Sequence, residues 1–403
     1  MTTPLPSVLF VDDEPFILDG LRRMLRPLRH DWDLQFAPGG PEALALMANQ
    51  PFAVVISDMR MPGMNGAQLL QEVQKRHPLT IRVILSGHAD QELVTQCVGV
   101  AHQYLAKPCD AETLKATLDT LRAMAGPEVT PEVRRLVGTL ERLPVLPGLY
   151  RDLQAALRRE DTGPAEVGAI IQQDPAMTAQ ILKLVNSAFF GLRRSIGTAQ
   201  EAASYLGLDT IRTLVLAHGV FGAQAPFACR SLSLEDLWTH SLAVATHAAT
   251  LAKTEGKPRA FQDTCFAGGI LHDLGLLVFA NGMPERCDEL ARRVQAEGLH
   301  LADLEGEVFG CTHGEVGAYL LGLWGLPPAL VAILREHHGQ GLSSGCPFTP
   351  SVAVWAADVI AGHSGIHPLF ETEDADFTTL AGLGFAERLP AWREACLGQE
   401  ARP

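Results

Sequence analysis

The spacing of apolar residues changes character about a third of the way along the chain. Up to about residue 124, short apolar runs typical of buried strands alternate with segments in which apolar residues recur at helical spacing. The strand-like runs are residues 8–11, 34–37, 53–57, 81–85 and 103–106. Because parallel strands are joined by right-handed crossovers through helices, these units predict an α/β domain: a five-stranded, parallel, doubly wound sheet.

The rest of the chain predicts helices only. Residues 125–138 contain the stretch AGPEVTPEV, which indicates a linker that extends or hinges the preceding helix. Helical spacing then recurs in residues 149–157, 164–173, 176–187, 198–205, 209–220, 234–254, 261–279, 285–297, 303–309, 313–323, 329–338 and 352–362. We therefore expect an α/β domain (1–124), a linker (125–138), an all-α domain (139–340) and a helical extension packed on it (341–403).

Composition and charge narrow the classes of function. The 403 residues are 47% hydrophobic and 19% charged, as in ordinary globular proteins, and their net charge of −14 disfavours nucleic-acid binding. The eight cysteines include no Cys-x-x-Cys pair, which is typical of reduced cytosolic proteins. The first residues do not resemble a signal peptide, and the uncharged residues 213–229 contain Gly, Pro, His and Gln. We expect a cytoplasmic protein that binds neither DNA nor a membrane.

Polar residues follow four of the predicted strands, at the point where each strand ends. They are Asp12 and Asp13, Asp58, Ser86 and Lys107. The carboxyl ends of parallel strands share one edge of the sheet, so we expect these side chains to meet there. Three carboxylates repel one another unless a cation joins them, and Mg²⁺ prefers such oxygen ligands. The set predicts a carboxylate nucleophile for a phosphoryl group, with a metal and an amine to neutralise charge.

The motifs around these residues resemble those of the response regulator receiver family, whose fold is flavodoxin-like. They are VLFVDDEP, VVISDMRMPGMNG, VILSGHAD and YLAKP, in the family's order and spacing. The resemblance implies that a histidine kinase phosphorylates Asp58. It also implies Mg²⁺ ligands in three carboxylates and one backbone carbonyl, those of Asp12, Asp13, Asp58 and Arg60. Three further side chains would respond to the phosphoryl group: Ser86, Tyr104 and Lys107.

The helical part is similar to HDOD modules over about residues 139–340. The similarity lies in LPVLPGLYRDL, DPAMTAQILKLVNSAFFG, FAGGILHDLGLLVF and HGEVGAYLLGLWGLP, of which the second is the most specific. It implies an all-α, HD-like fold with a role in signalling and protein interaction. The resemblance by itself implies no hydrolytic activity.

The same region has the ligand order of the wider HD superfamily of metal-dependent phosphohydrolases. The residues that match it are His240, His272, Asp273, His313, His337, His338 and Asp358, with Asp236 as a further candidate one turn before His240. Mixed imidazole and carboxylate ligands suit Fe, Mn, Zn or Co, and two such metals can activate water for attack on phosphorus.

The sequence departs from HD-GYP phosphodiesterases in two places. Gly275-Leu276 stands where those enzymes have Gly-Lys, and GQGLSSG stands where they have Gly-Tyr-Pro. These departures keep two other interpretations open, a structural metal or a polar network without metal.

Three hypotheses for function follow, in order of preference. The first is a phosphorylation-controlled scaffold that binds a downstream signalling protein or a second copy of itself. The second is a phosphohydrolase acting on cyclic dinucleotides or nucleotides. The third, a DNA-binding regulator, is disfavoured because no basic recognition helix follows residue 125.

Overall fold

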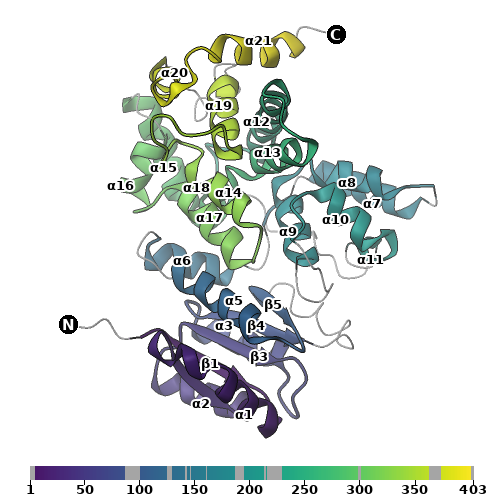
Figure 1. Cartoon of the computed structure of the whole chain (residues 1–403), viewed down its shortest axis with the longest axis vertical. Helices are drawn as coiled ribbons and strands as arrows, with labels where there is room; N and C mark the ends of the chain where they lie inside the picture. The colour runs from purple at the N-terminus through teal and green to yellow at the C-terminus, as the bar shows by residue number, and fades with distance from the viewer. Residues whose placement is uncertain are drawn as a thin grey trace. The chain divides into compact units, whose positions relative to one another are not determined.

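The computed structural model describes residues 5–86, 100–124, 129–140, 143–145, 147–159, 161–186, 195–212, 215, 229–297, 301–362 and 374–400. It divides into two compact units, drawn in Figure 1. The N-terminal unit is built mainly from residues up to 142, and the C-terminal unit mainly from residue 143 onward.

The N-terminal unit contains the predicted parallel sheet. Its strands pair in the order β2-β1-β3-β4-β5, and every pair is parallel. The strands are β1 (Ser7–Val11), β2 (Asp33–Ala37), β3 (Val54–Asp58), β4 (Ile81–Ser86) and β5 (Gln103–Ala106). The order places β1 beside β3, where the chain reverses its direction of winding, so the doubly wound prediction is confirmed.

Helices follow the strands as the apolar spacing predicted. They are α1 (Pro15–Met24), the 3₁₀ helix η1 (Arg26–His30), α2 (Gly40–Asn49), α3 (Gly66–Arg76) and α5 (Ala111–Met124). Helix α3 begins with a capping box: the Asn65 side chain accepts a hydrogen bond from Gln68 N at 2.9 Å, and Gln68 Oε1 accepts one from Asn65 N at 3.1 Å. This start directly follows the loop after β3, so it fixes the backbone beside Asp58.

The segment that we expected to be a linker contains a packed helix, α6 (Pro131–Thr139). The carbonyl of Gly138 accepts a hydrogen bond from Arg82 Nη2 at 2.7 Å, and Arg82, on β4, is only 1% exposed. A Cβ at Gly138 would lie 2.0 Å from the carbonyl oxygen of Pro78, so only glycine permits this approach. Helix α6 therefore packs on the N-terminal unit instead of forming an open connector.

The described chain after residue 142 is helical, as predicted. Its helices are α7 (Pro147–Arg158), α8 (Pro164–Ile171), α9 (Pro175–Val185), α10 (Ala199–Leu206), α11 (Leu208–Arg212), α12 (Leu234–Thr254), α13 (Arg259–Leu271), α14 (Leu274–Gly282), α15 (Pro284–Glu297), α16 (Leu301–Val308), α17 (His313–Leu323), α18 (Pro328–Glu336), α19 (Pro350–Gly362), α20 (Asp374–Leu380), the π-helical turn η5 (Ala381–Phe385) and α21 (Leu389–Glu400). Helices α12, α13 and α19 pack against one another, α18 packs on α13 and α19, and α19 is buried from Ser351 to its end.

Two predicted helices differ from the structure. The segment 261–279 is two helices, α13 and α14, because the chain turns at His272-Asp273, where His272 Nδ1 bonds the carbonyl of Gly269 at 2.7 Å. The segment 209–220 is helical in α11, and most of its remainder lies outside the described residues. Together, α13 and α14 (Arg259–Gly282) have the length and hydropathy of a membrane span, but 83% of the most apolar window is buried inside the fold, as in a core helix.

The C-terminal extension packs back on α12. Trp392 is fully buried, and its Nε1 donates a hydrogen bond to Glu255 Oε1 at 2.9 Å. Arg388 donates to the other oxygen of the same carboxylate at 2.8 Å. The ring of Trp392 also contacts Phe348 and Phe385, so the extension completes an aromatic cluster beside α12.

Candidate functional site

The edge of the sheet brings two of the predicted acids together around one amine. Lys107 Nζ lies 2.7 Å from Asp12 Oδ2 and is also paired with Asp58 Oδ1. The second oxygen of each carboxylate accepts a backbone hydrogen bond, from Glu14 N to Asp12 at 3.0 Å and from Arg60 N to Asp58 at 2.8 Å. The loops that follow β1 and β3 therefore hold both carboxylates in defined orientations.

Burial and neighbouring charges have opposite effects on the pKa values in this pocket. Asp58 is 8% exposed, and burial raises its pKa, although the ammonium group of Lys107 works against that rise. Burial by itself lowers the pKa of Lys107, but the hydrogen bonds of Lys107 to Asp12 and Asp58 outweigh burial and raise that pKa. The pocket thus keeps a cation between two acids, a charge balance that a hard metal ion would also supply.

The other predicted residues of this pocket occupy the expected strand ends. Asp13 is half-buried next to Asp12 and makes no hydrogen bond or ion pair with the described residues. Ser86 and Tyr104 are buried on β4 and β5, and Ser86 Oγ has no hydrogen-bond partner in the described part of the chain. Arg60 is an exposed residue, and its backbone N–H reaches the pocket through the bond to Asp58.

A second group of polar side chains gathers inside the C-terminal unit. Helix α12 contributes His240, the turn between α13 and α14 contributes His272 and Asp273, and the start of α17 contributes His313. His337 and His338 follow α18, and Asp358 lies within α19. Of these residues, only His338 is not classed as buried. We call this set the histidine cluster.

Asp273 lies between two halves of the histidine cluster. Its Oδ2 is 3.2 Å from His272 Nε2 and 3.5 Å from His240 Nε2, while its Oδ1 is 3.2 Å from His313 Nε2. Asp358 Oδ1 adds a carboxylate 3.1 Å from His240 Nε2. On each side, three possible metal-binding atoms lie within 4.8 Å of one another, in His240, His272 and Asp273 and in His313, His337 and His338. Asp273 therefore presents one carboxylate oxygen to each half of the histidine cluster.

Outer hydrogen bonds orient three of these imidazoles. The Nδ1 atoms of His272 and His337 face the carbonyls of Gly269 and Leu334, each at 2.7 Å. The Nδ1 of His313 faces the carboxylate of Glu305 at 2.8 Å. Since a carbonyl or carboxylate oxygen only accepts, each of these Nδ1 atoms carries a hydrogen. When the ring is neutral, the lone pair of its Nε2 therefore points into the histidine cluster. This is how proteins orient histidines that bind metals.

The half formed by His313, His337 and His338 needs a positive charge. The Nε2 of His313 lies 2.9 Å from the Nε2 of both other rings, and the lone pairs of neutral His313 and His337 would face and repel each other. Burial alone lowers the pKa of His313, but the carboxylates of Glu305 and Asp273 outweigh it and raise that pKa to about 10. Burial, aided by His313, lowers the pKa of His338 to about 3. A proton on His313, shared with two neutral rings, supplies the charge, and a metal cation fits the same donor set.

Two residues differ from the sequence-based expectation. Asp236 lies apart from the cluster: its carboxylate accepts a hydrogen bond from Ser233 Oγ at 2.6 Å, at the start of α12. Glu305, which we did not predict, is 0% exposed and holds His313 in place. The pattern did contain a signal for it, because Glu305 lies four residues from both Leu301 and Phe309, on the buried face of α16.

Family models match both parts of the chain. Residues 8–119 match the response regulator receiver domain, and residues 143–340 match the HDOD domain. The two matched ranges agree with the two resemblances that the motifs indicated.

Individual relatives match parts of the chain. An uncharacterized protein of Treponema pallidum is 29% identical over 214 residues, which is 52% of this chain and 40% of that protein. The hydrogenase transcriptional regulatory protein HoxA of Cupriavidus necator is 34% identical over 145 residues, 36% of this chain and 28% of its own length. The solved structure of the MmoQ response regulator from Methylococcus capsulatus shares 25% identity at a TM-score of 0.48, covering 62% of this chain and 97% of that one. The chain thus spans less than half the length of these two curated relatives.

Proposed function

Because the chain joins a response regulator receiver domain to an HDOD domain, we propose that it is a cytoplasmic two-component response regulator phosphorylated on Asp58 by a histidine kinase. The observation that carries this proposal is the placement of Asp58 beside Asp12 and Lys107 at the edge of the sheet. A carboxylate oxygen of Asp58 would attack the phosphorus of a phosphohistidine, so that an O–P bond forms as the N–P bond breaks.

The surrounding groups suit this transfer. Lys107 would pair with an oxygen of the phosphoryl group, and the hydroxyl of buried Ser86 would donate a hydrogen bond to another. The carboxylates of Asp12, Asp13 and Asp58 and the carbonyl of Arg60 would hold Mg²⁺. The ion would neutralise the charge of the acids and of the phosphoryl oxygens. Tyr104, buried on β5, would respond to the change at Ser86.

We assign the output to the HDOD domain. It would bind a downstream signalling protein or a second copy of the chain, and phosphorylation of Asp58 would control this binding. The net charge of −14 favours a protein partner over DNA.

Labelling with acetyl phosphate tests the phosphorylation site. We expect the full-length protein to acquire one Mg²⁺-dependent, acid-stable and base-labile phosphoryl group, and Asp58→Asn to abolish it. Asp19→Asn, at an exposed carboxylate on α1, is the matched control and should label normally. Labelling that persists in Asp58→Asn would reject the assignment.

A second function, metal-dependent hydrolysis of phosphate esters, is favoured by the two-sided geometry of the histidine cluster. His240, His272 and Asp358 would hold one Fe, Mn or Zn ion, and His313, His337 and His338 a second, with Asp273 between them. Such ions activate water and neutralise phosphate oxygens.

Metal analysis combined with a hydrolysis assay on cyclic dinucleotides tests this function. We expect bound metal and turnover in the wild type, and loss of both in Asp273→Ala. Asp236→Ala, in the same domain but outside the cluster, should retain both. A protein that takes up no metal and hydrolyses nothing would leave only the scaffold function.

A further inference from the structure

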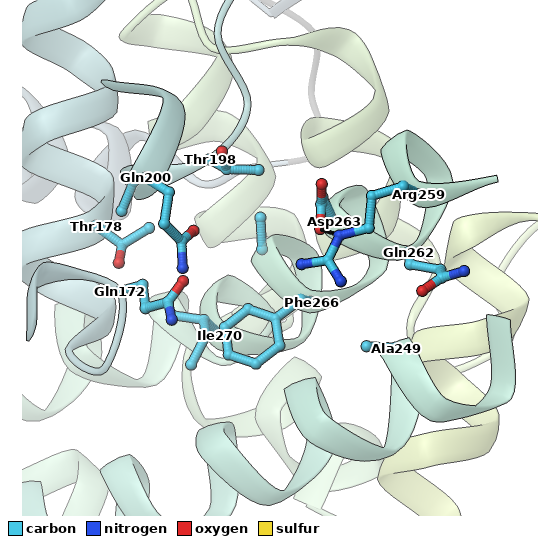
Figure 2. A pocket seen from close by; sticks show the side chains of 12 residues that line it. Gln172, Thr178, Thr198, Gln200, Ala249, Arg259, Gln262, Asp263, Phe266 and Ile270 are labelled. Carbon is cyan, nitrogen blue, oxygen red and sulfur yellow. Dashed lines mark ion pairs between the residues drawn. The ribbon is translucent and has the colours of Figure 1, made fainter. Parts of the chain in front are cut away.

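A cavity separate from both sites opens between α8, α9 and α10 on one side and α12 and α13 on the other (Figure 2). It encloses about 580 Å³, a volume that includes the part open to solvent. None of its lining residues belongs to the histidine cluster, and all of them lie in the C-terminal unit.

Amide side chains form one wall of the cavity. Gln172 follows α8 and Gln200 lies in the first turn of α10, and Figure 2 shows their amide groups directed toward each other. Neither side chain makes a hydrogen bond with another described residue. In contrast, Gln262 Nε2 is already bonded to the carbonyl of Lys257 at 2.8 Å. Each free amide offers one donor and one acceptor in a single plane.

Apolar side chains of α13 form the opposite wall. The ring of Phe266 and the side chain of Ile270 extend toward the amides of Gln172 and Gln200 in Figure 2. Ile270 is almost completely buried, whereas Phe266 is half-buried and presents part of its ring to the cavity. A flat apolar group could therefore pack against Phe266 while its edge reaches the amides.

The rim carries charges that cancel. Arg259 is 84% exposed, and its Nε lies 2.8 Å from Asp263 Oδ1. The remaining polar lining residues, Thr178 and Thr198, are neutral hydroxyls. With one cation paired to one anion, the cavity favours a neutral polar ligand over a highly charged one.

We propose that this cavity binds the base of a purine nucleoside. A purine has a flat π face for the Phe266 ring, and its edge alternates donors and acceptors at the spacing of a glutamine amide. An aliphatic ligand would leave the amides of Gln172 and Gln200 unsatisfied, and a polyanion would find no unpaired cation among the described lining residues.

Calorimetric titration of the full-length protein with adenosine and with guanosine tests the proposal. Nucleosides carry no phosphate, so the histidine cluster has no anionic group to bind. We expect saturable binding of at least one of them, weakened about tenfold in Gln172→Met and in Gln200→Met, which keep side-chain length and remove the amide. Gln173→Met is the matched control, because Gln173 Nε2 bonds the carbonyl of Ala169 and does not line the cavity.

Three results would overturn the proposal. The first is the absence of saturable binding by either nucleoside. The second is unchanged affinity in both Gln172→Met and Gln200→Met; Gln200 is exposed on α10, so that variant is expected to fold. The third is binding that disappears in His338→Ala, which would locate the nucleoside at the histidine cluster instead.

Discussion

Replacing Glu305 by Gln tests whether a side chain that binds no metal itself prepares the histidine cluster to bind one. The buried carboxylate of Glu305 accepts hydrogen bonds from both His313 N and His313 Nδ1, each at 2.8 Å. Glutamine has the same size but only one acceptor oxygen, so its NH₂ group must face one of these two donors. The orientation of His313 then weakens, and the loss of such an outer partner lowers metal affinity about 10- to 100-fold.

That factor corresponds to about 1.4–2.8 kcal/mol of binding free energy. Mn²⁺ or Zn²⁺ affinity can be measured by competition with a chelator, starting from metal-free full-length protein. Glu307→Gln is the control, because Glu307 lies on the same helix, is 66% exposed and pairs with Arg293 at the surface. Affinity within twofold of wild type in Glu305→Gln, or an equal loss in Glu307→Gln, would refute the reasoning.

Three further predictions concern stability. Burial lowers the pKa of His313, but the neighbouring carboxylates outweigh it and raise the folded-state pKa to about 10 from an ordinary 6.5. The metal-free protein should therefore lose stability as the pH rises from about 6.5 toward 10, and a constant Tm over that range would contradict this. Gly275→Ala should cost about 1–3 kcal/mol in urea unfolding, because the new Cβ would lie 2.0 Å from the His313 carbonyl oxygen. The control is Gly306→Ala on α16, whose new Cβ meets no atom within 4 Å and which should stabilise the protein by up to about 1 kcal/mol. Equal changes in unfolding free energy for Gly275→Ala and Gly306→Ala would count against the packing described at Gly275. Arg82→Met leaves the Gly138 carbonyl without its donor, which should cost about 1–3 kcal/mol and speed amide exchange in α6; unchanged exchange would show that the bond contributes nothing.

The sheet and its polar edge were predictable because both depend on local pattern and topology. Strands buried on both faces, such as β3, give continuous apolar runs, and the parallel order alone places Asp12, Asp58 and Lys107 at one edge. The ligand-like histidines were predicted in a different way, from the ligand order that they share with the wider HD superfamily. Which atoms face each other across the histidine cluster was not, because that depends on how α12, α17 and α19 pack.

The features that sequence analysis missed are set by tertiary contacts. Arg82 sits in a strand pattern where an arginine suggests an exposed position, yet it is buried because backbone carbonyls surround its guanidinium group. The turn at His272-Asp273 interrupts a continuous apolar pattern, and Gly275, just after the turn, lies against the His313 backbone. Glu305 stood out only as a charged residue on an apolar face.

The bond between Arg82 and Gly138 bears on how such modules are recombined. A chimera cut at residue 124 would separate the sheet from α6 and leave a guanidinium group facing a foreign sequence. A graft joined after residue 140 would carry the sheet together with α6 into the new host. In this protein the exchangeable piece ends one helix later than the α/β pattern suggests.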